Sequence, residues 1–332
     1  MSSLMRQPQG YWPHFAALGY GVVGYLAGVW LLLAESGGLN LLGTLCLAHA
    51  LVIAAYMIHE CAHNTIFTAP RHNAWLGEVL SFLVGAGYGD YAAIRHKHMR
   101  HHTERADVVA CDFRQLLLQR PVLLKTVQWL EWAWIPAVDL FMHALVLILP
   151  FVHAERRHLR GRVLSVLLVR GALFTALALV SVKALLLYAM AYLLFLHALR
   201  FMDVHQHTYA LFETLEEERR PLPQERDRAY EDRNTFSNLV SQHHPWLNLW
   251  TLNFGYHNAH HVHPTTPWYA LPRLHRQLFG DSASHALPVT ALLKSYVRYR
   301  VARVLNADPA DAPIPPAERF IGVVGVSFLT AH

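Results

Sequence analysis

The sequence predicts an all-α integral membrane protein, and two observations support this fold class. Of the 332 residues, 54% are apolar and only 15% are charged, a balance that is unusual for a soluble chain. Four windows also approach the roughly 20 apolar residues that a bilayer-spanning helix needs. These predicted spans are residues 15–34, 39–58, 163–182 and 183–201.

The connections between these windows predict two hairpins whose ends lie on one side of the membrane. The first two spans are joined by "ESGG", which has no Lys or Arg. The segment before the third span carries four arginines, Arg156, Arg157, Arg160 and Arg162. Because basic connections tend to remain in the cytosol, this segment and both termini are predicted to be cytosolic.

Two further apolar segments are predicted to lie at the membrane surface. Residues 76–88 are too few for a crossing and indicate a re-entrant or membrane-lying segment. Residues 121–150 are long enough to cross, but a crossing there would place the four arginines outside. Glu131, Asp139 and a tryptophan cluster favour an interfacial helix, with a fifth span as the alternative.

We expect one membrane domain over residues 1–305, followed by a Pro-rich C-terminal tail over 306–332. The charged stretch 213–233 is expected to be a solvated cytosolic loop or helix.

The composition does not indicate a nucleic-acid partner. The net charge of +5 comes from arginine, and the chain has no lysine-rich tract of the kind that binds nucleic acid. Three cysteines without CxxC spacing indicate neither a disulfide framework nor a thiolate metal site.

Histidines gather in three short motifs beside apolar segments. "HECAH" places two rings four residues apart, and "HMRHH" and "HNAHH" each place three rings at i, i+3 and i+4. On a helix such rings lie close to one face. The eight residues are His59, His63, His98, His101, His102, His257, His260 and His261.

Metal ions are the simplest partner for so many imidazoles. Polar groups are costly near an apolar phase unless a partner satisfies them. Eight nitrogen ligands exceed what one four-coordinate zinc can use, so two metals are implied. Imidazole binds zinc, copper, iron and nickel alike, and the spacing therefore does not choose the metal.

In this order, and separated by membrane segments, the three motifs resemble the histidine boxes of the membrane fatty acid desaturase and hydroxylase superfamily. The similarity covers roughly residues 40–275 and includes the Pro-Trp and Leu-Pro elements after "HNAHH". It implies a non-haem di-iron centre, with the eight histidines as ligands, in a cap at the cytosolic ends of four membrane helices. It also implies that O2 is used to remove hydrogen from a fatty acyl chain.

Members of this superfamily often have another histidine ligand between the second and third boxes. "FMDVHQHTYALF" is the matching place, and His207 is our preferred ligand there, with His205 as the alternative. Asp203 is a candidate to orient a ligand imidazole from behind, or else a surface carboxylate.

The resemblance favours fatty acid desaturation, while hydroxylation and oxidative decarboxylation of a free fatty acid to a terminal 1-alkene remain alternatives. Electrons must come from an external ferredoxin-type or cytochrome-type donor, because the chain lacks GxGxxG, CxxCH and a cysteine set. A metal transporter would instead need ligands inside the spans, where only His49 and His197 lie. Acyl length, headgroup and oligomeric state are not encoded in these patterns.

Overall fold

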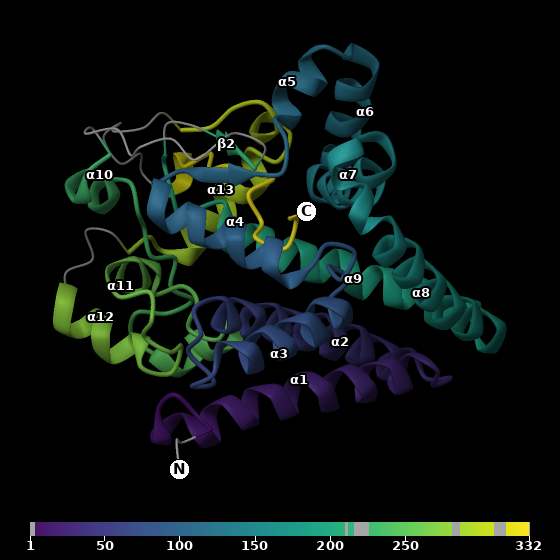
Figure 1. The fold of residues 1–332 in the computed structure, drawn as a ribbon, viewed down its shortest axis with the longest axis horizontal. Helices are drawn as coiled ribbons and strands as arrows, with labels where there is room; N and C mark the ends of the chain where they lie inside the picture. Colours follow the sequence, from purple (N-terminus) through teal and green to yellow (C-terminus); the bar gives the residue numbers. More distant parts are fainter. Residues whose placement is uncertain (1–3, 210–211, 216–225, 281–285, 309–316, 332) are drawn as a thin grey trace. The chain divides into compact units, whose positions relative to one another are not determined.

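The computed structural model describes residues 4–209, 212–215, 226–280, 286–308 and 317–331, and this part of the chain is mostly helical (Figure 1). The chain divides into two compact units. Unit 1 contains residues 1–92 and 145–198, and unit 2 contains residues 93–144 and 199–331.

Four helices of the described chain are long and apolar enough to cross a membrane, which confirms the predicted number. They are α1 (Tyr11–Leu32), α2 (Gly37–Ala62), α8 (Arg160–Val180) and α9 (Val182–Asp203). Each overlaps its predicted window, and α2 continues past its window through the first histidine of "HECAH". Only 11% of the apolar window of α8 is buried, so this helix presents an apolar surface suited to lipid.

Within unit 1, α1 and α2 lie side by side because glycines let their backbones approach closely (Figure 1). A Cβ added to Gly28 would lie 2.8 Å from the Leu47 Cβ, and one added to Gly43 would lie 2.7 Å from the Leu31 Cβ. Small residues commonly allow such contacts between membrane helices. Asn40 Nδ2 supports the connection by donating to the Leu31 carbonyl oxygen at 3.0 Å.

The predicted membrane-lying segment 76–88 begins inside α3 (Pro70–Leu83). Two arginines of α8 hold this helix within unit 1. Arg170 Nη1 donates to the Phe82 carbonyl oxygen at 2.6 Å, and Arg162 forms an ion pair with Glu78. Placement of 76–88 at the membrane surface stays a prediction.

The region 121–150 contains two helices, α6 (Pro121–Trp132) and α7 (Ala137–Val152). They are separated at Trp134, whose φ is 62°, and at Pro136, which has no N–H to donate. Neither helix is among the four candidate spans.

The two carboxylates of this region are buried and paired. Arg200 donates to Glu131 Oε2 at 2.6 Å and to Glu131 Oε1 at 2.9 Å, and it also forms an ion pair with Asp139. All three side chains are nearly inaccessible within unit 2. Glu131 and Asp139 are therefore partners of one arginine, and placement of 121–150 at the membrane interface stays a prediction.

Unit 2 also contains a short parallel pair of strands, β1 (Asp107–Val109) and β2 (Phe212–Thr214), with Val108 opposite Glu213. Sequence patterns did not predict these strands. The remaining helices of unit 2 are α4 (Tyr91–Glu104, which begins in unit 1), α5 (Phe113–Leu118), α10 (Arg228–Arg233), α11 (His257–Val262), α12 (Leu271–Phe279) and α13 (Val289–Arg298). Short 3-10 helices are η1 (Pro8–Gly10) and η2 (Ala154–Leu159) in unit 1, and η3 (Pro245–Thr251), η4 (Ala302–Val304) and η5 (Ala317–Arg319) in unit 2.

The end of the chain packs into unit 2. Most residues of 317–331 are buried, including Phe320 and Val324. Residues 309–316, which hold all four prolines of the tail, lie outside the described residues. The proposed boundary at residue 305 stays a prediction.

Candidate metal centre

The first motif lies at the end of α2 in unit 1. His59 is in the last turn and His63 is the C-cap residue, so the helix places the two rings one turn apart. Their ring centroids are 4.7 Å apart, and both residues are buried. Neighbouring Glu60 accepts a hydrogen bond from Thr65 Oγ1 at 2.6 Å.

The second and third motifs lie on α4 and α11, and both have rings at i, i+3 and i+4. Around an ideal helix, i and i+4 differ by roughly 40°, whereas i+3 lies roughly 60° to the other side of i. In each helix the i and i+4 rings join one histidine cluster and the i+3 ring joins the other. The i+3 residue is His101 in α4 and His260 in α11. Each triple is therefore shared between two clusters.

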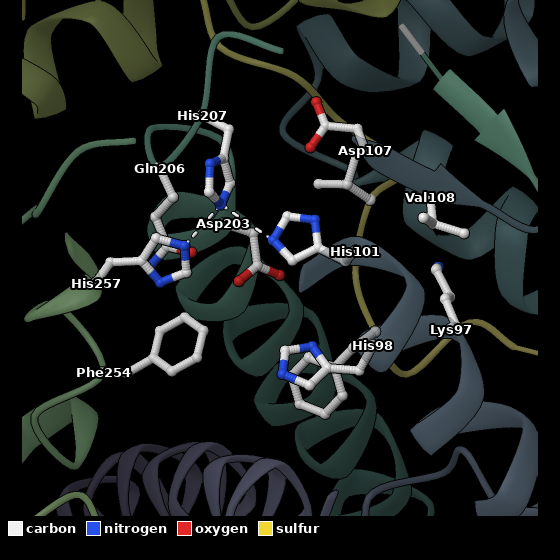
Figure 2. A pocket seen from close by; sticks show the side chains of 12 residues that line it. Lys97, His98, His101, Asp107, Val108, Asp203, Gln206, His207, Phe254 and His257 are labelled. Carbon is white, nitrogen blue, oxygen red and sulfur yellow. Dashed lines mark hydrogen bonds between the residues drawn. The ribbon is translucent and has the colours of Figure 1, made fainter. Parts of the chain in front are cut away.

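The first of these, the four-histidine cluster, consists of His101, His207, His257 and His261, all in unit 2. His207 Nε2 lies 2.7 Å from His257 Nε2 and 3.1 Å from His101 Nε2 (Figure 2). Each ring offers one nitrogen, and these four nitrogens all lie within 4.8 Å of one another. Three separate segments thus converge on one small volume.

The second, the three-histidine cluster, consists of His98, His102 and His260, also in unit 2. His102 Nε2 lies 3.2 Å from His98 Nε2 and 3.1 Å from His260 Nε2. The nitrogens of all three rings again lie within 4.8 Å of one another. Both clusters could hold a metal ion.

The rings of the four-histidine cluster are neutral at pH 7. Burial lowers the pKa of His101 to about 4 and lowers the pKa values of His207, His257 and His261 well below 6.5. A neutral imidazole has one nitrogen lone pair available to a metal. His257 Nδ1 and His261 Nε2 are buried without a hydrogen-bond partner among the described residues. Such imidazole nitrogens are suitable ligands for a metal such as zinc, copper, iron or nickel.

Hydrogen bonds on the outer side fix which nitrogen faces the cluster. His101 Nδ1 lies 2.8 Å from the Ala106 carbonyl oxygen, and His261 Nδ1 lies 2.8 Å from Glu231 Oε1. A carbonyl or carboxylate oxygen can only accept, so Nδ1 donates in both neutral rings. Nε2 then keeps its lone pair and is directed to the cluster.

Glu231 was missed from sequence. It lies on α10, inside the charged stretch that was expected to be solvated, but it is only 4% exposed. Arg105 donates to its Oε2 at 3.0 Å and Arg228 pairs with the same oxygen at 3.4 Å. No local pattern distinguishes Glu231 from the other acids of this stretch, because its role depends on contact with His261.

The structure separates the two candidates for the additional ligand. His207 belongs to the four-histidine cluster, and His205 belongs to neither cluster. His205 Nδ1 lies 3.1 Å from the Phe201 carbonyl oxygen, and its ring contacts the rings of Phe201, Tyr296 and Phe320. His205 therefore lies among aromatic side chains.

A cavity of ≈ 40 Å³ adjoins the four-histidine cluster within unit 2 (Figure 2). Besides histidines, its walls are Lys97, Asp107, Val108, Asp203, Gln206, Phe254, Val326 and Phe328. Asp203 points into this space, and its buried Oδ2 has no hydrogen-bond partner among the described residues. Burial raises the pKa of Asp107 to about 7 and lowers the pKa of Lys97 to about 7. The lining thus combines charged, polar and apolar side chains.

Comparison with protein families gives one match. A family model described as fatty acid desaturase matches residues 36–292, which is more than half of the chain and includes all the histidines of the three motifs and His207. A search of curated proteins found no match.

Proposed function

Because the chain belongs to the fatty acid desaturase family, we propose that it catalyses O2-dependent desaturation of a fatty acyl chain at a di-iron centre. The observation that carries this proposal is the pair of clusters in which imidazole nitrogens converge, with lowered pKa values in the four-histidine cluster. The lining of the adjoining cavity includes apolar side chains, which suit contact with methylene groups.

We assign one iron to each cluster. His101, His207, His257 and His261 would hold the first iron. Asp203, which lines the cavity, is a candidate to orient one of these imidazoles. His98, His102 and His260 would hold the second iron. His59 and His63 stay predicted iron ligands, because they form a one-turn pair in the first box.

Desaturation needs more than the protein's own groups. Conversion of CH2–CH2 to CH=CH releases two electrons and two protons, and reduction of O2 to two waters consumes four of each. An external ferredoxin-type or cytochrome-type donor must supply the remaining two electrons, and solvent the two protons. Iron held by the clusters would supply the redox chemistry that acts on O2. The chain's own side chains hold the metals, exclude water and position the substrate.

In the membrane, we propose two hairpins, α1 with α2 and α8 with α9, with both termini and the histidine clusters on the cytosolic side. The four apolar helices support insertion. Sidedness rests on Arg156, Arg157, Arg160 and Arg162, which precede or begin α8.

The decisive experiment combines metal analysis with product analysis on the purified full chain. We expect about two irons per chain, and an unsaturated acid by mass spectrometry after a labelled saturated fatty acid is supplied with O2 and a reducing system. Reactions without reductant or without O2 are the matched controls and should give no product.

Other products would change the proposal in defined ways. A hydroxy acid or a terminal alkene would replace desaturation with one of the two related oxidations. Stoichiometric zinc after iron-replete expression, without O2 consumption, would contradict an oxidase altogether.

A further inference from the structure

The C-terminal segment Phe320–Ala331 lies outside the residues that the family model matches, yet it reaches the metal cavity. Val326 and Phe328 are part of the cavity wall. The centroid of the Phe328 ring lies 5.9 Å from the ring centroid of His98, which belongs to the three-histidine cluster. The segment thus brings two apolar side chains to the reaction site.

A buried lysine holds this segment beside the site. Lys97 Nζ donates to the Ser327 carbonyl oxygen at 2.6 Å, to the Thr330 carbonyl oxygen at 3.0 Å and to Thr330 Oγ1 at 3.1 Å. These acceptors lie on both sides of Phe328 in the chain. Lys97 also precedes His98 directly on α4, so one helix positions both a histidine of the cluster and the aromatic ring next to it.

The start of the segment is also held in place, by close packing and by hydrogen bonds. Gly322 has φ of 72°, and a Cβ there would lie 2.0 Å from the Val204 carbonyl oxygen, so only glycine fits. Its N–H donates to Asp308 Oδ2 at 2.7 Å. Buried Arg303 donates to the carbonyl oxygen of Ile321.

The two side chains differ from the other apolar groups of the wall. Val108 follows the second histidine box closely, and Phe254 precedes His257 by three residues. Both are therefore tied to segments that carry cluster histidines. The described residues of Phe320–Ala331 contribute no histidine to either cluster. Their side chains can therefore shape the cavity without supplying a metal ligand.

We propose that Phe320–Ala331 is the wall that positions the acyl chain, and that Phe328 and Val326 determine which carbon is oxidised. This inference rests on the proposed function. The methylenes of an acyl chain are chemically alike and form no hydrogen bonds, so the site must choose among them by the shape of apolar contacts. A change of one methylene in an apolar pocket typically alters discrimination by about tenfold or more.

The test compares lining and non-lining substitutions in the same segment. Phe328→Leu and Val326→Ala alter the wall, and Val324→Ala is the matched control because Val324 is buried nearby but does not line the cavity. For each full-length variant, iron content, double-bond position, and KM and kcat across saturated chains of increasing length are measured. We expect at least about a tenfold change in the ratio of products or in chain-length preference for the lining variants only. Iron content should be unchanged.

A second measurement does not depend on turnover. A fatty acid with a mid-chain diazirine is bound to the wild-type protein and photolysed, and the labelled peptide is identified. Label in 320–331 supports the wall, even if no oxidised product forms, in which case only the proposed function fails. Label confined to other segments would overturn the inference. So would lining variants with unchanged product position and chain-length preference.

Discussion

The four-histidine cluster and the three-histidine cluster are built from the same two helices used in opposite ways. α4 gives a one-turn pair to the three-histidine cluster and its i+3 ring to the other, and α11 does the reverse. The four-histidine cluster then adds His207 from outside any helix, and carbonyl and carboxylate partners fix His101 and His261. Identical spacing therefore produces two sites with different surroundings.

Removal of one histidine ligand from either cluster should have the largest effect on iron content and turnover. His207→Ala should remove a ligand from the four-histidine cluster, and His260→Ala from the three-histidine cluster. Each variant should lose turnover and retain about one iron instead of two, as measured by metal analysis and product formation.

Two comparison variants make this result specific. His263→Ala changes an exposed ring next to α11 and should keep both irons and activity. His205→Ala should keep both irons but lower thermal stability, because the ring is buried among Phe201, Tyr296 and Phe320. Iron loss in His205→Ala but not in His207→Ala would reverse our ligand assignment.

A smaller effect should come from the carboxylate behind His261. Glu231→Gln keeps the size of the side chain but removes the charge that orients and polarises the ring. Loss of such a partner typically lowers metal affinity or activity by about 10–100-fold. Iron titration should show this loss at one of the two sites only.

Asp232→Asn is the matched control for this variant, because Asp232 is the next residue and its side chain is 58% exposed. Equal weakening in both variants would indicate a general effect of charge on α10 and would remove the specific role of Glu231.

The smallest effect concerns the stability of the metal-free protein as pH falls. His101 has a pKa of about 4 in the folded state against an ordinary 6.5, so the unfolded chain binds the proton more tightly. The contribution of the neutral ring to the free energy of unfolding is therefore fully present above pH 6.5. It is lost as pH falls towards 4, and the free energy of unfolding decreases by roughly 3 kcal/mol for this one ring.

Thermal unfolding of the metal-free protein in detergent should therefore show a falling Tm between pH 6.5 and 4. His101→Gln should make this slope shallower, since one buried titrating ring is removed. A Tm that does not change over this interval would contradict burial of neutral rings in the four-histidine cluster.

The spans and the histidine motifs could be predicted because both are local properties of the sequence. Apolar length identified the four candidate spans, and the spacing of His59 with His63 placed two rings one turn apart at the end of α2. Periodicity could not show how α4 and α11 share their rings between two clusters, because that depends on how the helices face each other.

Sequence by itself thus determined that the protein is a mostly helical membrane protein with histidine groups suited to metal. Only the tertiary structure separated His207 from His205, brought Glu231 to His261, and placed Val326 and Phe328 in the cavity wall. Hydropathy and helical spacing are properties of short segments, from about one helical turn to one membrane span. The contacts named above join residues that are distant along the chain, so they form only when the chain packs.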